Sequence, residues 1–225
     1  DKALNDEKFE LGLSFHQQGN PDQAELIYRE VLNGDPTHKH AWSNLGAILS
    51  KKNKLEDAIN CYRKALEIDQ QFGECWFNLG NALRKGMNPA GAEAAFVQAL
   101  KCNNSLFGAA VGLGQALSEQ GKFPQAVEVF KQIIAQKNDD PDLYSHLGNA
   151  LRMQGLRDEA MQAYQVMLQL KPNDPKIRHQ FGLVMMDVGR LEEAFAEFKN
   201  ALGLKPDYPE AHNSMSIVLQ MLKQD

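Results

Sequence analysis

The chain has 225 residues, a formal net charge of −5 and 43% hydrophobic residues, an ordinary composition for a soluble folded protein. The negative charge argues against a nucleic-acid-binding surface, which needs a clustered basic face. No apolar stretch approaches the ~18 residues of a membrane span, and no secretory signal opens the chain. Since it begins Asp-Lys-Ala without a methionine, we expect a processed form or an excised fragment.

The cysteines argue against a disulfide framework and against a structural zinc site. There are three of them, Cys61, Cys75 and Cys102, and no CxxC pair occurs. We therefore expect small buried or half-buried apolar residues in a reducing compartment, and we predict a cytoplasmic location.

Small residues and aromatic residues recur along the whole chain with a period of 34 residues. Such a period is the signature of a repeat architecture. The glycines of this register are Gly12, Gly46, Gly80, Gly114, Gly148 and Gly182. The alanines are Ala24, Ala58, Ala92, Ala126, Ala160 and Ala194. Four residues after each alanine stands an aromatic residue: Tyr28, Tyr62, Phe96, Phe130, Tyr164 or Phe198.

Each period predicts a helix, a turn and a second helix. Apolar and small residues at Trp42, Leu45, Gly46 and Leu49 make one stripe of a helix, and Ala58, Tyr62 and Ala65 make a second stripe. Helix-stopping glycines and prolines stand where the turns and helix ends are expected. In chain order the repeats are 5–38, 39–72, 73–106, 107–140, 141–174 and 175–208, followed by a lone helix at 209–225.

The pattern W-x2-L-G-x2-L, followed by Ala, aromatic, Ala and Pro, resembles the tetratricopeptide repeat (TPR). The resemblance covers the chain from about Asn5 to its end. It implies an all-α fold, an α-solenoid of helix-turn-helix repeats forming a right-handed superhelix, and a single domain over residues 1–225. Mild departures occur at Lys8, Ala110 and Arg178, which replace the bulky residue near the start of a repeat.

Polar residues on the side of each first helix away from its partner helix predict a binding surface. In TPR arrays this side lines the concave groove, and here it is rich in amides, which can pair with the N–H and C=O groups of an extended peptide. Arg84 and Arg152 would add charge-assisted donors for a carboxylate. The alternative is an ordinary solvated helix face. The predicted contact residues are Asn44, Asn78, Asn81, Arg84, Gln115, His146, Asn149, Arg152 and Gln180.

Two variants of the family offer precedents for this groove. Asn44 and Asn78 match the asparagine row of the TPR arm of O-GlcNAc transferase, although the row is only partial. The carboxylate clamp of TPR co-chaperones is incomplete, because Phe77 stands where its lysine belongs and Gly112 where its second asparagine belongs. The incomplete clamp argues against binding of chaperone tails.

The last helix carries more apolar residues than a terminal helix usually exposes. Its segment Ser214–Leu222 includes Ile217, Val218, Met221 and Leu222 around the helix. Such a surface marks contacts, so we expect either that the natural chain continues or that a second copy covers it. Phe9 and Leu13, near the other end, are further candidate contacts.

Catalytic motifs are not found. No P-loop, GxSxG or HExxH sequence is present. His38 and His40 lie close together, but no third metal ligand is near in the sequence, so we predict no metal site, no cofactor and no catalytic residue.

We predict a non-catalytic protein–protein interaction module that holds an extended peptide of a partner in its groove. One alternative is a substrate-recruiting arm of a larger, glycosyltransferase-like enzyme. Another is a scaffold that self-associates through its terminal helix. No nucleic acid or membrane partner is expected.

Overall fold

The computed structural model describes residues 2–223, and within them the chain is entirely helical. The prediction of an all-α fold is confirmed. The thirteen described helices are α1 (Lys2–Gln17), α2 (Pro21–Gly34), α3 (Lys39–Lys51), α4 (Leu55–Ile68), α5 (Gly73–Lys85), α6 (Pro89–Cys102), α7 (Phe107–Glu119), α8 (Phe123–Gln136), α9 (Pro141–Met153), α10 (Arg157–Leu170), α11 (Pro175–Asp187), α12 (Leu191–Leu204) and α13 (Pro209–Leu222).

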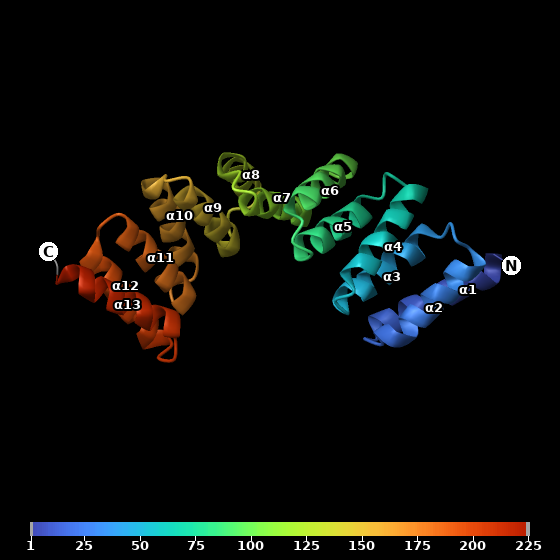
Figure 1. Ribbon diagram of the computed structural model, residues 1–225, viewed down its shortest axis with the longest axis horizontal. Helices are drawn as coiled ribbons and strands as arrows, with labels where there is room; N and C mark the ends of the chain where they lie inside the picture. The colour runs from blue at the N-terminus through green and yellow to red at the C-terminus, as the bar shows by residue number, and fades with distance from the viewer. Residues whose placement is uncertain (1, 224–225) are drawn as a thin grey trace. The chain divides into compact units, whose positions relative to one another are not determined.

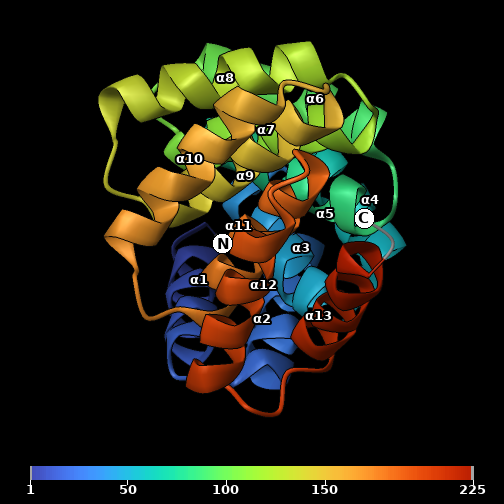
Figure 2. The same ribbon diagram turned by 90° about the vertical axis from the view of Figure 1, so that its left-hand side faces the viewer.

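The helices group into two compact units, Asp1–Gln120 and Gly121–Asp225. Within each unit every helix packs against the next one along the chain (Figures 1 and 2). The boundary falls between α7 and α8, the two helices of the predicted repeat 107–140. The two units are described separately below, and the single domain over 1–225 stays a prediction.

The periodic glycines allow close packing of each first helix on the aromatic ring of its second helix. A Cβ added at Gly46 would lie 2.7 Å from the Tyr62 ring, and one at Gly182 would lie 2.5 Å from the Phe198 ring. These distances are too short for any larger residue without a shift of the ring. The prediction that small residues let the two helices approach closely is confirmed.

The turn between the two helices of a repeat places one residue in the left-handed region. Gly155 and Gly189 have φ values of 86° and 79°, as expected for a helix stop by glycine. Asn53 and Met87 occupy the same place in their repeats with φ values of 61° and 60°. Left-handed backbone is tolerated by asparagine but strained for methionine, so the turn after α5 is the least favourable of these.

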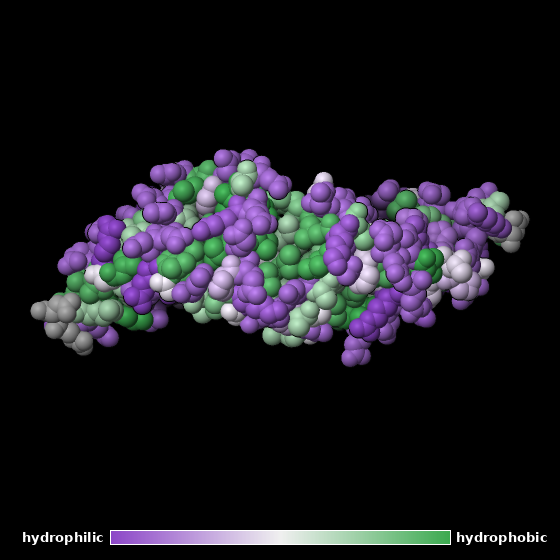
Figure 3. Space-filling model, turned by 90° about the horizontal axis from the view of Figure 1, so that it is seen from above, coloured by the Kyte–Doolittle hydropathy of each residue, from purple (hydrophilic) through white to green (hydrophobic). Residues whose placement is uncertain are grey.

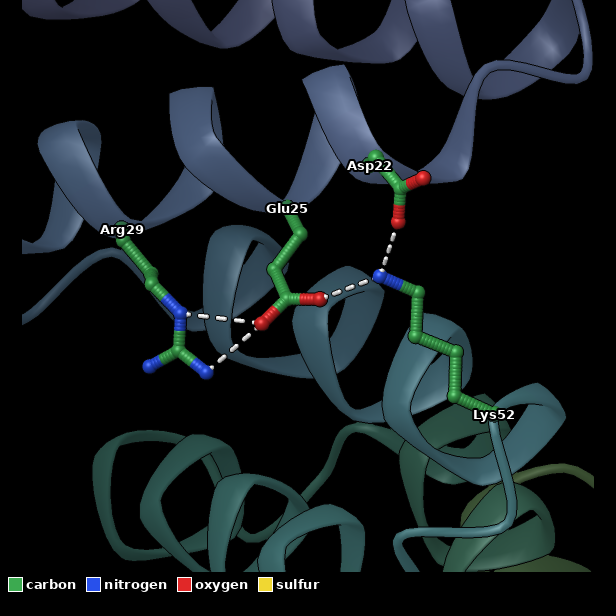
Figure 4. A network of polar contacts seen from close by, with 4 residues as sticks. All are labelled: Asp22, Glu25, Arg29 and Lys52. Carbon is green, nitrogen blue, oxygen red and sulfur yellow. Dashed lines mark hydrogen bonds and ion pairs between the residues drawn. The ribbon is translucent and has the colours of Figure 1, made fainter.

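Ion pairs join neighbouring repeats on the side of the second helices. Lys52, just after α3, places its Nζ 2.5 Å from Asp22 Oδ1 and 2.7 Å from Glu25 Oε2 on α2 (Figure 4). Arg29 Nη2 lies 2.8 Å from the other oxygen of Glu25. The hydrogen bonds from Lys52 and Arg29 lower the pKa of Glu25.

A similar link recurs 68 residues later, with an uncharged glutamine in place of the lysine. Gln120 Nε2 donates to Glu93 Oε2 at 2.7 Å, and these residues have the repeat registers of Lys52 and Glu25.

Polar side chains cover much of the surface seen in Figure 3, and apolar atoms show between them. Across residues 2–223 no helix has both the length and the apolar character that a membrane crossing requires.

Candidate functional site

All nine predicted contact residues lie on first helices of the repeats. Asn44 belongs to α3, three of the others to α5, Gln115 to α7, three to α9 and Gln180 to α11. The name first-helix face is used below for the side of α3, α5 and α7 in one unit, and of α9 and α11 in the other, on which these residues stand. The continuous row from Asn44 to Gln180 involves both units and stays a prediction.

The side-chain amide of Asn44 forms a hydrogen bond within the protein. Its Nδ2 donates a hydrogen bond of 3.2 Å to the hydroxyl of Tyr28, the aromatic residue of the preceding repeat. Burial raises the pKa of Tyr28, and the bond from Asn44 opposes that shift. Because the phenol is buried, an acceptor or donor for its hydroxyl contributes to stability.

Amides at this place follow the tyrosine repeats and not the phenylalanine repeats, although among the described residues only Asn44 forms a hydrogen bond with its tyrosine. Tyr28, Tyr62 and Tyr164 are each followed sixteen residues later by an amide: Asn44, Asn78 and Gln180. Phe96, Phe130 and Phe198 lack a hydroxyl and are followed by Gly112, His146 and Ser214.

Gly112 shows why the amide row is interrupted in the fourth repeat. A Cβ at Gly112 would lie 2.5 Å from the Phe96 ring, so a side chain there would displace the ring. The ring of His146 instead stacks on that of Phe130, with the centroids 5.5 Å apart and the planes at 17°. In both repeats, packing against the phenylalanine ring accounts for the absence of an amide at this place.

The two amides of α5 are not engaged by other described residues. Asn78 is half-buried and Asn81 is exposed, and neither side chain makes a hydrogen bond within the part of the chain that the structure describes. Gln180 on α11 is half-buried and likewise has no such bond among residues 2–223. By contrast, Asn149 accepts a 2.5 Å hydrogen bond from the Tyr164 hydroxyl.

Both arginines are engaged with the next first helix. Arg84 donates to Gln115, and its Nε lies 3.1 Å from Glu119 Oε1 on α7. Arg152 on α9 forms the equivalent ion pair with Asp187 on α11, and this hydrogen bond raises the pKa of Arg152. Glu119 and Asp187 share one register, 68 residues apart, as do the two arginines. The repeated arginine therefore links successive repeats.

Family models agree with this arrangement of repeats. Three models described as tetratricopeptide repeat match residues 40–72, 61–94 and 111–175, which together cover more than half of the chain. The chain belongs to the tetratricopeptide repeat family. A search of curated proteins finds no match.

Solved TPR structures share the fold. YrrB, described as a TPR protein with an unusual peptide-binding site, matches with a TM-score of 0.71 at 20% identity, over 84% of this chain and 97% of its own. PilF of Pseudomonas aeruginosa matches with a TM-score of 0.76 at 20% identity, over 96% and 98%. PilW, a type IV pilus biogenesis factor, matches with a TM-score of 0.78 at 19% identity, over 93% and 97%. The nearer resemblance to the TPR arm of O-GlcNAc transferase finds no support in these matches.

Side-chain size alone did not reveal a hydrogen bond that recurs near the start of the TPR repeats. Trp42 Nε1 donates to the Pro36 carbonyl at 2.8 Å, and Trp76 Nε1 donates to the Gln70 carbonyl at 2.9 Å. Arg178 Nε donates to the Pro172 carbonyl at 3.0 Å in the same register. Arg178 thus replaces the donor that tryptophan supplies, and the shared N–H group was the signal in the sequence.

His179 is buried rather than presented to a ligand. Its Nε2 lies 3.0 Å from Ser214 Oγ and its Nδ1 lies 3.3 Å from the Tyr208 hydroxyl, so it joins α11 to α13. Burial lowers the pKa of His179, with a smaller opposing effect from Glu210. Its place beside the predicted groove positions gave no sign of this role.

His38 and His40, at the start of the second TPR repeat, have structural roles. His38 Nδ1 accepts a 3.1 Å hydrogen bond from the Ala41 N–H and caps α3. Its ring lies 4.4 Å from that of Phe9 and 6.4 Å from that of His40. Among the described residues, no three His, Cys, Asp or Glu side chains are grouped to hold a metal ion. Cys61 and Cys75 are buried and Cys102 is half-buried, and all three are free thiols.

Proposed function

We propose that this TPR protein is a non-catalytic, cytoplasmic interaction module that binds an extended peptide of a partner protein on the first-helix face of residues 1–120. The observation that carries this proposal is the pair of unengaged amides on α5, Asn78 and Asn81. An amide offers both a donor and an acceptor, so the pair can hydrogen-bond to one peptide unit of an extended chain.

The surroundings of these amides fit a peptide with mixed character. Phe77 precedes them on α5, and its ring packs 6.1 Å from that of Phe96. Lys51 and Lys85 stand near the carboxyl ends of α3 and α5, where Lys85 Nζ donates to the Ser50 carbonyl at 3.2 Å. Main-chain recognition by the amides would supply affinity, and these side chains would favour apolar and acidic residues in the ligand.

The test selects peptides from a displayed random library on the wild-type chain and measures their affinity by calorimetry. The Asn78→Ala/Asn81→Ala variant is compared with the control Asn60→Ala/Asn200→Ala, which replaces two exposed helical asparagines elsewhere. Loss of two hydrogen bonds of about 1 kcal/mol each predicts a roughly 10- to 30-fold weaker binding for the first variant. Equal affinity of all three proteins for every selected peptide would overturn the proposal.

A second candidate function is a scaffold that self-associates through the terminal helix. On α13, Ile217, Leu219 and Met221 remain 40%, 40% and 38% exposed. Exposed apolar side chains of this kind favour a contact. We expect Ile217→Gln/Leu219→Gln to abolish any concentration-dependent rise in mass measured by sedimentation, and a wild type that stays monomeric at every concentration excludes this candidate. No observation favours the enzyme-arm alternative.

A further inference from the structure

A surface hollow lies on the side of the second helices, away from the first-helix face. It is formed within residues 1–120 between α4 and α6, with α5 as its floor, and has a volume of about 900 Å³. Trp76, Leu79 and Leu83 line the floor, and Leu66 and Ala95 line the walls. This hollow is called the outer groove below.

On the wall of the outer groove, α6 carries smaller side chains than α4. Its sequence, PAGAEAAFVQALKC, places Gly91, Ala94 and Ala95 on the wall. The same registers of α4 hold Asp57, Asn60 and Cys61. A helix that is apolar on nearly all sides is usually covered.

The rim of the outer groove carries uncompensated positive charge. Arg63 on α4 and Lys101 on α6 line opposite walls, and neither forms an ion pair within residues 2–223. The acidic residue of the rim, Glu67, is compensated by Lys64, whose Nζ lies 3.2 Å from Glu67 Oε2. Two cations without an ion pair among the described residues therefore flank the apolar floor.

We propose that the outer groove binds an amphipathic, acidic segment of a partner protein, which places an apolar side chain over Trp76 and carboxylates against Arg63 and Lys101. Tryptophan and arginine are the residues that most often dominate binding energy in interfaces. Opposite charges at the rim fix the orientation of the segment and favour acidic partners over basic ones.

The outer groove is independent of the peptide site on the first-helix face. Trp76, Leu79 and Leu83 point from α5 toward the outer groove, whereas Asn78 and Asn81 belong to the predicted first-helix face of the same helix. The two sites can therefore be blocked separately, and the failure of one proposal can be told from the failure of the other.

The experiment selects peptides from the same displayed library on the wild-type chain. Each peptide is then measured on Ala94→Trp, which fills the exposed wall, on Arg63→Glu/Lys101→Glu, and on Asn78→Ala/Asn81→Ala. We expect one class of peptides that combines an apolar residue with Asp or Glu. This class should bind the first two variants about tenfold or more weakly and the third unchanged.

Cys102 gives a direct readout of occupancy because it lines the outer groove and is half-buried. Burial raises the pKa of Cys61 to about 11 and that of Cys75 to about 12, so these thiols react slowly. A bound peptide should slow the reaction of Cys102 with a disulfide reagent.

Replacing the acidic residues of the peptide with lysine should restore binding to Arg63→Glu/Lys101→Glu.

Three results would overturn the proposal. In the first, every selected peptide loses affinity only with Asn78→Ala/Asn81→Ala. In the second, no selected peptide binds Ala94→Trp more weakly than wild type. The third is a wild-type dimer, seen by sedimentation, that Ala94→Trp dissociates, because the outer groove would then belong to a second copy of this chain. Circular dichroism of each variant confirms that it retains the wild-type helix content.

Discussion

The two copies of the phrase LGNALR, at Leu79–Arg84 and Leu147–Arg152, have identical side chains but differ in one of their interactions. Their arginines both form an ion pair with the next first helix. Their asparagines differ, since Asn81 is exposed and has no hydrogen bond in the described part of the chain, while Asn149 accepts one from Tyr164. The residue opposite Asn81 in its repeat is Phe96. A buried hydroxyl fifteen residues away thus decides whether an identical amide is free.

The largest effects should come from the glycine of each phrase. A Cβ at Gly80 would lie 2.6 Å from Phe96, and one at Gly148 would lie 2.7 Å from Tyr164. Gly80→Ala and Gly148→Ala should each lower the free energy of unfolding by about 1–3 kcal/mol in urea titrations. Gly203→Ala, where a Cβ would meet nothing within 4 Å, is the control and should be neutral or stabilising. Equal behaviour of all three would contradict the packing argument.

The turn after each phrase should give effects of opposite sign. Met87 and Gly155 occupy the same register and have φ values of 60° and 86°. Met87→Gly should raise the free energy of unfolding, and Gly155→Ala should lower it, each by roughly 1 kcal/mol. Thermal unfolding followed by circular dichroism measures both. Since Met87 is 89% exposed, lost packing does not complicate its replacement.

Exchanging the aromatic residues should exchange the states of the two asparagines. Tyr164→Phe removes the bond to Asn149 and should lower the free energy of unfolding by about 1 kcal/mol. Phe96→Tyr should offer Asn81 a partner and weaken any peptide that depends on Asn81. The side-chain amide resonances of Asn81 and Asn149 in NMR spectra report each exchange. Unchanged resonances in both variants would show that the hydroxyl does not control the amide.

The arginine pairs should contribute less, because both are partly exposed. The exposed fractions are 31% and 44% for Arg84 and Glu119, and 33% and 27% for Arg152 and Asp187. Arg84→Gln and Arg152→Gln should each cost about 0.5 kcal/mol, less at high salt. Exchanging the pair as Arg152→Asp/Asp187→Arg should restore most of the loss. A full double-mutant cycle with no coupling would contradict the ion-pair assignment.

The smallest expected effect is on the pH dependence of stability, and it distinguishes α11 from α7, the two helices that carry the acidic partners of the arginines. α11 carries His179, whereas α7 has Val111 in that register. Because burial lowers the pKa of His179, the unfolded chain binds the proton first as pH falls below ~6.5, and the free energy of unfolding decreases. Above that pH the contribution is fully present. His179→Val should therefore lose less stability than wild type between about pH 7 and pH 5 in urea titrations.

The repeat period predicted most of the architecture because it reports packing that every repeat must satisfy. Gly46, Ala58 and Tyr62 face one another inside a single repeat, so their spacing alone indicates a helix pair. The bond from Asn44 to Tyr28 and the pairing of Arg84 with Glu119 cross from one repeat to the next. Finding them requires two registers to be read together. The outer groove depends on side chains that α6 lacks, and a repeat pattern does not mark such an absence.

The dependence of Asn81 and Asn149 on a ring hydroxyl has an evolutionary consequence. Codons for tyrosine and phenylalanine differ at one base, so a single mutation beneath the surface can release or sequester an amide on it. An amide stands fifteen residues before the ring at Asn81, Gln115 and Asn149, so this switch is confined to the third, fourth and fifth repeats. Selection could in this way alter what the surface recognises without changing a surface residue.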